Sequence, residues 1–383
     1  MLTALGPLSM DMYLPSLPDI MRALHVPTAQ VQLTVSSYFF GFAVGQILYG
    51  PLSDRHGRRP VLLGALAFYA AATLVCAAAQ SIDVLIAARF VQAIGGSGAI
   101  VLARAMVRDL YSGARAGREL SLMGSIMGFA PIVAPMIGGV LQTEFGWRAS
   151  FFFMGGFAIF AIAMVGRWLP ETLTKRASEP ISWASLAQGY SAVLRHPAFL
   201  AYLGIITATY AGLFAWVSGG SIVLQGVYGL SPFAFGFVFS IGAAGYVIGT
   251  TIAARRVIRL GLERTIGLGV TLIAIGAVAA AAVVAAAIPN PVWLVAAMAL
   301  YLAGLGFAMP QAMAGALAPF PHRAGTASSL MGFVQQTVAA LVAAAVGAYL
   351  GRSAWPMAGG VVVMGVTAFL VFAFTHRLRA QER

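Results

Sequence analysis

Residues 29–80 read AQVQLTVSSYFFGFAVGQILYGP, then LSDRHGRR, then PVLLGALAFYAAATLVCAAAQ. The first and third parts contain no charged residue, whereas the eight residues between them include Asp54, Arg55, Arg58 and Arg59. A helix needs about 20 mostly apolar residues to cross the hydrocarbon core of a bilayer. The stretch therefore predicts two membrane-spanning helices, over 29–51 and 60–80, joined by a tight charged turn.

The composition of the whole chain agrees with this interpretation. Of its 383 residues, 60% are hydrophobic and only 9% are charged, whereas a soluble domain carries about 25% charged residues. The 44 glycines suit close contact between helices in lipid. The single cysteine, Cys76, excludes an intrachain disulfide and any metal site built from cysteines.

Similar apolar runs recur along the chain and give twelve expected spans. They cover roughly 1–21, 29–51, 60–80, 84–107, 119–141, 148–168, 198–223, 233–254, 265–287, 292–314, 326–349 and 356–375. The longest connection, after the sixth span, is rich in charged residues. We therefore expect an all-α membrane protein with a six-helix bundle over 1–168, a cytoplasmic hinge linker over 169–197, and a second six-helix bundle with a short basic tail over 198–383.

The basic residues set the expected orientation. If both termini are cytoplasmic, 18 of the 23 lysines and arginines fall in cytoplasmic loops or in the tail, as the positive-inside rule requires. Only Arg22, Arg148 and Arg352 fall on the other face, and the remaining two, Arg89 and Arg104, lie within a span. The excess of 12 positive charges is thus a topology signal that requires no nucleic-acid partner. We expect a multi-pass protein of the inner membrane, in contact with lipid, as a monomer.

The two halves of the chain are related by an internal repeat. Arg115-Ala-Gly117 followed by Ser-Leu-Met-Gly124 opens the fifth span, and Arg323-Ala-Gly325 followed by Ser-Leu-Met-Gly332 opens the eleventh. The offset of 208 residues also relates Gly96 to Gly304. The sequence therefore predicts two six-helix pseudo-repeats.

The turn after the second span carries a recognisable motif. Gly50-Pro-Leu-Ser-Asp54-Arg55-His-Gly57-Arg58-Arg59 resembles the signature G-x-L-a-D-r-x-G-r-[RK] of the major facilitator superfamily. The resemblance implies a substrate site between the two halves near the middle of the membrane. The alternative is a basic loop that only sets topology.

As a gating loop, residues 50–59 would latch the cytoplasmic side of the halves. Gly57 supplies a permissive backbone, Asp54 can sit at the positive N-terminus of the eleventh span, and the arginines can pair with Asp109. The second-half copy is altered: Arg259-Leu-Gly261 keeps the pattern R-x-G, but Ile258 stands where the acid should be.

The fourth span contains an arginine. Arg89-Phe-Val-Gln92-Ala-Ile-Gly-Gly96 resembles the family pattern R-x-x-Q-G-x-[GA], and Arg89, Gln92 and Gly96 share one helix face. An arginine within a span normally faces a partner or a water-filled cavity. The alternative is that Arg89 extends to the membrane interface.

The fifth span carries a stripe of small residues and prolines on one face. The stripe resembles the antiporter motif G-x-x-x-G-P-x-x-x-G-P-x-x-G-G, although its spacing departs from the usual form around Phe129 and Ala130. A seam for helix packing would have the same appearance. The stripe consists of Gly124, Gly128, Pro131, Pro135 and Gly138, bordered by Gly139.

Asp11 is the one acid expected deep within a span. Hydrocarbon disfavours the charged form of a carboxylate, which makes Asp11 the candidate proton carrier. The surrounding Asp11-Met-Tyr13-Leu-Pro15-Ser-Leu-Pro18 resembles a signature of the Bcr/CflA subfamily of drug exporters. Its members usually carry several apolar residues before this point, so we expect the natural chain to start upstream of Met1.

Other candidates carry less weight. No ATP-binding motif G-x-x-x-x-G-K-[ST] occurs, and the five histidines fall outside the expected spans, so we expect no cofactor and no metal site. Each aromatic residue in a span is more often a packing residue than a cavity lining. The candidates for a substrate cavity are Tyr13, Tyr38, Tyr210, Trp216, Tyr246 and Tyr301.

The resulting expectation is a proton-coupled antiporter that exports small drugs or toxic compounds, not an enzyme. Asp11 would carry the proton and Arg89 would tune it. A paired acid and base would leave the cavity nearly neutral, which disfavours strongly cationic substrates. The first alternative is an exporter of a natural metabolite, such as a small peptide or a sulfur compound, and the second is a membrane protein without transport activity.

Overall fold

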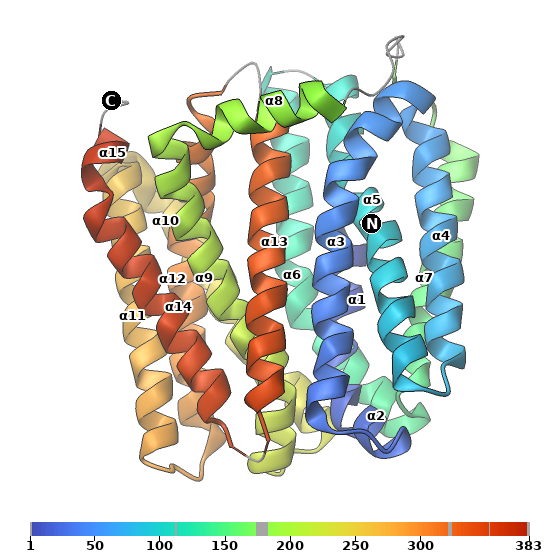
Figure 1. Cartoon of the computed structure of the whole chain (residues 1–383), viewed down its shortest axis with the longest axis vertical. Helices are drawn as coiled ribbons and strands as arrows, with labels where there is room; N and C mark the ends of the chain where they lie inside the picture. The colour runs from blue at the N-terminus through green and yellow to red at the C-terminus, as the bar shows by residue number, and fades with distance from the viewer. Residues whose placement is uncertain (1, 112, 174–182, 321–323, 352, 381–383) are drawn as a thin grey trace. The chain divides into compact units, whose positions relative to one another are not determined.

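The computed structural model of the chain describes residues 2–111, 113–173, 183–320, 324–351 and 353–380, and its regular structure in these ranges is helical (Figure 1). Among the described residues, eleven helices are long and apolar enough to cross a membrane. The predicted all-α membrane fold is therefore confirmed. Eleven of the twelve expected spans appear as long helices, and the first appears in another form.

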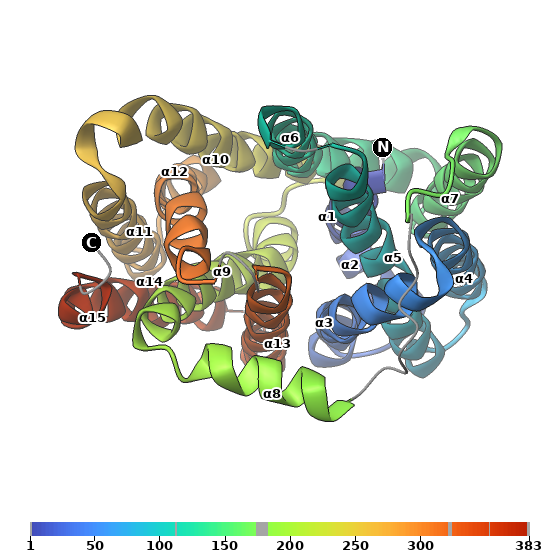
Figure 2. The ribbon, with the colours of Figure 1, turned by 90° about the horizontal axis from the view of Figure 1, so that it is seen from above.

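The first compact unit comprises residues 1–182 together with Pro232–Gly236. Five long helices follow the N-terminal segment, and Figure 2 shows α3, α4, α5 and α7 as neighbours. The bounds are α3 Thr28–His56, α4 Arg58–Ala78, α5 Ile82–Leu110, α6 Gly113–Phe145 and α7 Arg148–Trp168.

The first expected span is divided into short helical pieces. They are η1 (Leu2–Ala4), α1 (Leu5–Asp11), η2 (Leu14–Ser16) and α2 (Leu17–Ala23). Proline lacks the N–H that an α-helix donates to the carbonyl four residues earlier. Pro15 and Pro18 therefore cannot donate to the carbonyls of Asp11 and Leu14, and the helix breaks just after Asp11.

Glycines allow the long helices of each unit to approach closely. A Cβ at Gly41 of α3 would collide with the backbone carbonyl of Phe90 in α5, and one at Gly45 would meet Ser97. In the second unit, Gly245 and Gly249 of α10 lie equally close to the backbone of α12. The repeat seen in the sequence thus corresponds to a repeated helix contact.

The second compact unit comprises residues 183–231 and 237–383. A twelve-residue helix, α8, lies within the expected linker and belongs to this unit, so the division falls after Ser182 instead of across 169–197. The bounds are α8 Trp183–Leu194, α9 Pro197–Ile222, the π-helical turn η3 Val223–Val227, α10 Pro232–Leu260, α11 Leu262–Ala285, α12 Pro291–Leu317, α13 Ala324–Tyr349, α14 Trp355–Phe374 and α15 His376–Ala380.

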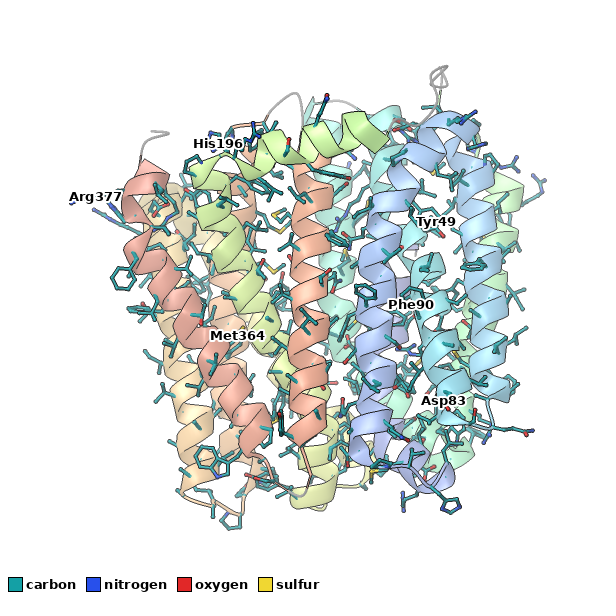
Figure 3. The ribbon with its side chains drawn as sticks, viewed as in Figure 1. Tyr49, Asp83, Phe90, His196, Met364 and Arg377 are labelled. Carbon is teal, nitrogen blue, oxygen red and sulfur yellow. The ribbon has the colours of Figure 1, made fainter. Side chains whose placement is uncertain are left out.

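Charged side chains gather at the ends of each unit. In the first unit Asp83 lies at the end of the bundle away from the α3–α4 turn, and in the second unit His196 and Arg377 lie at one end (Figure 3). Asp11, Arg89 and Arg104 lie further inside the described helices, and of these three Asp11 and Arg89 are buried, with exposed fractions of 7% and 1%. Because buried charges are costly, these two residues are the first candidates for a functional site.

Candidate functional site

Arg89 is buried in the first unit, where α5 contacts α1. Its Nη1 donates to the backbone carbonyl of Ser9 (3.1 Å) and to Oε1 of Gln92 (2.6 Å). Nε2 of Gln92 donates in turn to the hydroxyl of Thr73 in α4 (2.8 Å). Arg89 and Gln92 thus lie on one face of α5, and their contacts join α5 to α1 and α4.

Aromatic rings cover the guanidinium of Arg89. Its Cζ lies 4.1 Å from the centre of the Tyr38 ring, 4.6 Å from that of Tyr13 and 6.0 Å from that of Phe151. A ring face attracts a cation within about 6 Å. The charge of Arg89 is thus stabilised by rings and neutral acceptors, so Tyr13 and Tyr38 act here as neighbours of Arg89.

Asp11 does not pair with Arg89. No ion pair joins the two residues, and the Asp11 carboxylate has no hydrogen-bond partner among the described residues. Ser9 and Tyr13, which contact Arg89, lie two residues to either side of Asp11 along the chain. The expected neutral pair is thus not formed in this structure.

Gly138 of the expected antiporter motif has a clear packing role. A Cβ at this position of α6 would collide with the backbone carbonyl of Met12. Pro131 and Pro135 lie inside α6, and Gly124, Gly128 and Gly139 belong to the same helix. Gly138 therefore allows α6 to approach the broken first span at Met12, the residue after Asp11, whereas Gly139 faces the backbone of Pro232.

The charged turn after the second span is shorter than its sequence indicates. Helix α3 continues through Asp54 and Arg55 to His56, and Gly57 alone joins it to α4. Gly57 has φ +101° and ψ 151°, a conformation that a residue with a side chain rarely adopts. Gly50 lies inside α3, where a Cβ would meet nothing within 4 Å.

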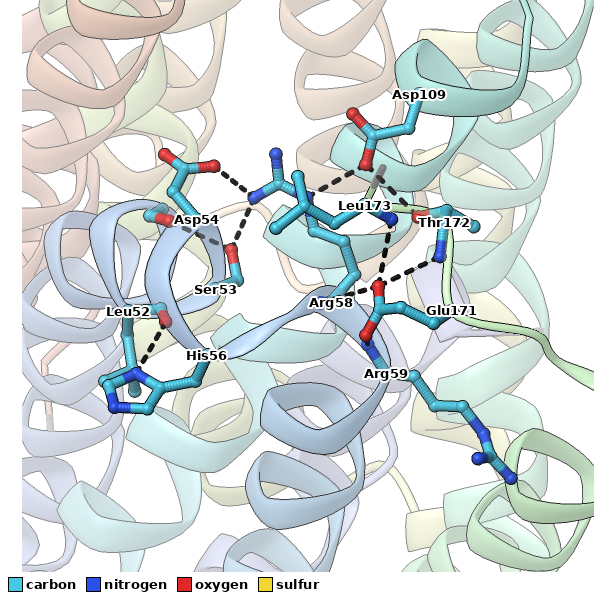
Figure 4. Close-up of polar contacts among 11 residues, drawn as sticks. Leu52, Ser53, Asp54, His56, Arg58, Arg59, Asp109, Glu171, Thr172 and Leu173 are labelled. Carbon is cyan, nitrogen blue, oxygen red and sulfur yellow. Dashed lines mark hydrogen bonds and ion pairs between the residues drawn. The ribbon is translucent and has the colours of Figure 1, made fainter. Parts of the chain in front are cut away.

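Arg58 connects the acids of this region (Figure 4). Its Nη1 lies 2.6 Å from Oδ1 of Asp54, and its Nε lies 2.9 Å from Oδ2 of Asp109 at the end of α5. The predicted pairing of the arginines with Asp109 is confirmed for Arg58. The expected contact of Asp54 with the eleventh span joins the two units and stays a prediction.

Glu171, just after α7, completes this group and was not predicted from the sequence. Its carboxylate accepts hydrogen bonds from the backbone N–H groups of Arg58 (3.0 Å), Arg59 (3.2 Å), Thr172 (2.9 Å) and Leu173 (3.0 Å). Partial burial favours the neutral acid, but these N–H donors outweigh it and hold the pKa of Glu171 below its usual value. Glu171 thus caps the start of α4 as a charged group.

The second unit contains a buried ion pair that the sequence analysis also missed. Nε of Arg379 in α15 lies 3.2 Å from each carboxylate oxygen of Glu263 in α11, and the hydroxyl of Tyr202 donates to Glu263 (2.9 Å). Nη2 of Arg379 donates to the carbonyl of Phe372 (2.8 Å). A cavity of about 450 Å³ lies beside the pair. The sequence signal that could have indicated this pair is the 208-residue offset of the repeat, which relates Arg379 to Glu171.

The aromatic candidates of the second unit fall into two groups. Trp216 and Tyr301 are fully buried: Trp216 stacks on Phe239, and Tyr301 donates to the carbonyl of Thr209 (2.8 Å). Tyr210 and Tyr246 are half-buried. Within this unit the first two are packing residues, and the last two keep accessible surface that a substrate could contact.

Comparison with known proteins adds to this geometry. The sequence model described as the Major Facilitator Superfamily matches residues 1–344. The chain belongs to this superfamily. Its fold is similar to that of a D-xylose-proton symporter: the crystal structure of that protein matches with a TM-score of 0.75 at 17% identity, over 98% of this chain and 96% of the symporter chain. The xylose transporter XylE of Escherichia coli, in a partially occluded inward-open conformation, gives a TM-score of 0.73 at 16% identity.

Curated relatives of the superfamily are more similar in sequence. A bicyclomycin resistance protein homolog of Haemophilus influenzae is 32% identical over 96% of this chain and 93% of its own length. Multidrug resistance protein D of Escherichia coli is 31% identical over 88% of this chain and 84% of its own length. A chloramphenicol resistance protein of Pseudomonas aeruginosa is 32% identical over 85% of this chain and 77% of its own length. The predicted family resemblance is confirmed, and the chain is a transporter, not an enzyme.

Proposed function

We propose that this transporter is a proton-coupled antiporter that exports small, uncharged or weakly charged drugs or toxic compounds. The names of its relatives, which refer to bicyclomycin, chloramphenicol and multidrug resistance, support this substrate class. The proton gradient would supply the driving force, so export requires no cofactor.

One observation carries the proposed mechanism. Asp11 is 7% exposed and has no hydrogen-bond or ion-pair partner among the described residues. A buried carboxylate without a partner favours the protonated form, and contact with water or with a cation favours the charged form. Asp11 would bind a proton where it is enclosed and release the proton when the transport cycle opens its surroundings.

The proposal also includes an orientation in the inner membrane with both termini in the cytoplasm. The basic residues at the α3–α4 turn and in α15 support it. Reporter fusions at Glu179 and at Arg379 should then indicate a cytoplasmic location, and a fusion at Glu144 should indicate a periplasmic location. A periplasmic signal at Glu179 would contradict this orientation.

Asp11→Asn tests the mechanism, because asparagine keeps the size of aspartate but cannot titrate. We expect it to abolish proton-driven export of chloramphenicol while chloramphenicol binding survives, and we expect Asp11→Glu to retain partial export with a shifted pH optimum. The measurement is drug-induced proton movement in vesicles with an imposed pH gradient. Normal proton release by Asp11→Asn would show that the proton uses another group.

A further inference from the structure

The second unit carries a large excess of positive charge. In its described part the only acid is Glu263, and Glu263 is paired with Arg379. The other arginines of this part have no acidic partner among the described residues. They are Arg195, Arg255, Arg256, Arg259, Arg264 and Arg377. This unit therefore offers unpaired cations to a ligand with negative charge.

The cavity beside Glu263 lies where two membrane-spanning helices meet the end of the unit. Its volume is about 450 Å³, which falls within the range of about 300–1,000 Å³ that is usual for small-molecule pockets. Its walls are the start of α11, the end of α12, Tyr202 of α9 and Arg379 of α15. Because α11 and α12 are both candidate spans, their ends place the cavity at the level of the lipid headgroups.

The cavity extends from the surface to the buried ion pair. Gly261 and Arg264, which line it, are exposed. Tyr202 and Arg379, which also line it, are only 6% and 2% exposed. A ligand can thus enter from the surface and reach the guanidinium of Arg379.

Two cations of the lining have N–H donors that no described residue uses. A guanidinium has five such donors. Nε of Arg379 donates to Glu263, and Nη1 and Nη2 each donate one hydrogen, to Thr375 and to the carbonyl of Phe372. Two donors of Arg379 remain, and Arg264 forms no hydrogen bond or ion pair in the described part of the chain. Several donors in one cavity favour an anion with several acceptor oxygens, such as a phosphate group.

The remainder of the lining is mainly apolar and includes Leu260 and Leu262. In the first unit the residue after the turn glycine is Arg58, which pairs with Asp54 and Asp109. In the second unit Leu262 follows the turn glycine, and an aliphatic side chain forms no such pairs. A free phosphate ion gains nothing from apolar walls, whereas the glycerol and first methylene groups of a phospholipid do.

We propose that this cavity binds the headgroup of an anionic phospholipid. The phosphate accepts hydrogen bonds from Arg264 and Arg379, and the apolar part next to it packs on Leu260 and Leu262. Basic pockets between spanning helices bind lipid headgroups through this combination. A zwitterionic headgroup fits less well, because its ammonium group meets a lining whose one acid is already paired. The site lies in the second unit, so the inference does not depend on the proposed antiport.

The experiment uses the full chain in dodecylmaltoside micelles, titrated with dioleoylphosphatidylglycerol, with the retained lipid measured by native mass spectrometry. Arg264→Gln should weaken binding about tenfold, the effect of losing a hydrogen bond to a charged group. Ala318→Phe, which narrows the cavity without removing a charge, should also weaken it. The matched control is Arg377→Gln, which removes the same charge at the same end of the unit, from a side chain that points away from the bundle (Figure 3) and should bind as wild type does.

Three results would overturn the site. Equal weakening by Arg377→Gln and Arg264→Gln would mean that surface charge attracts the lipid without a specific cavity. Equal affinity for dioleoylphosphatidylcholine would contradict the preference for an anionic headgroup. Inorganic phosphate that displaces the lipid at equal concentration would show that the cavity takes a free anion. Thermal unfolding without lipid verifies that each variant is folded, and if Ala318→Phe is not, the two arginine variants still decide.

Discussion

Each unit has a turn formed by a glycine with positive φ, the α3–α4 turn in the first and the α10–α11 turn in the second. The charged residue that returns to this turn from the end of the unit is an acid in the first unit and a base in the second. Gly57 and Gly261 both have positive φ, +101° and +77°, and each begins a spanning helix. In the first unit the acid Glu171 returns from beyond the sixth span to the start of α4. In the second unit the base Arg379 returns from beyond the twelfth span to Glu263, in the first turn of α11.

The two clusters also differ in their exposure to solvent. Asp54 of the first is 52% exposed, whereas the side chains of Arg379 and Glu263 are 0% and 11% exposed. Exposed ion pairs contribute little to stability, while breaking a buried pair is costly because a charge is left unpaired. We therefore expect the Arg58–Asp54 pair to contribute less to the free energy of unfolding than the Arg379–Glu263 pair.

Asp54→Asn should give the largest functional effect. If the turn acts as a gating latch, the substitution removes one charge from it, and we expect transport to fall roughly tenfold, as the loss of one charged hydrogen bond predicts. Membrane insertion should be normal. The measurement is drug export from vesicles, with Asp83→Asn, an acid at the other end of this unit, as the control. Export at the normal rate would mean that the turn only sets topology.

Arg379→Ala should give the largest loss of stability. It leaves Glu263 buried without its partner, which costs about 3 kcal/mol. Alanine at the equivalent position of the first unit, Glu171→Ala, removes a helix cap and should cost about 1 kcal/mol. Unfolding of the two variants in detergent measures the difference, and the double variant Glu263→Gln with Arg379→Gln should recover much of the loss. Equal losses of unfolding free energy in Arg379→Ala and Glu171→Ala would show that the buried pair is no more important for stability than the cap.

Substitution of the two turn glycines should give the smallest effect, and the two positions are closely matched. A side chain at either position strains the backbone by about 1 kcal/mol. At Gly57 the added Cβ would also lie 2.5 Å from Oε2 of Glu171, whereas at Gly261 it would meet nothing within 4 Å. Gly57→Ala should therefore be more destabilising than Gly261→Ala, by about 1 kcal/mol if the cap of Glu171 is displaced. The difference should disappear when Glu171→Ala is combined with each variant.

Much of the fold follows from the sequence because each span is an apolar run of bilayer length. The helices nevertheless extend beyond these runs, since charged residues such as Asp54 and Arg55 do not stop a helix and Gly57 does. The break in the first span could not be read from hydropathy, because it depends on Pro15 and Pro18. Helix α8 was overlooked because it is too short and too close to charged residues to register as a span.

The candidate site could be predicted where the contacts are local or follow a known motif, as for Arg89 with Gln92 and for Arg58 with Asp109. It could not be predicted where distant segments meet. Glu171 lies 113 residues from Arg58, and Arg379 lies 116 residues from Glu263. Glu171 lies in the expected linker and Arg379 in the expected tail, where a charged residue is expected simply because it faces water. The absence of a pair between Asp11 and Arg89 likewise could not be predicted, because Arg89 donates instead to the backbone carbonyl of Ser9 and to Gln92.

The way in which Glu171 holds α4 has a consequence for how this sequence can vary. The four groups that donate to its carboxylate are all main-chain N–H groups, which every residue except proline supplies. The cap therefore places no demand on the side chains at positions 58 and 59 beyond excluding proline. Substitutions there can alter the charge of the α3–α4 turn over generations while the start of α4 stays anchored. Arg379 and Glu263 have no such freedom, because each must change together with the other.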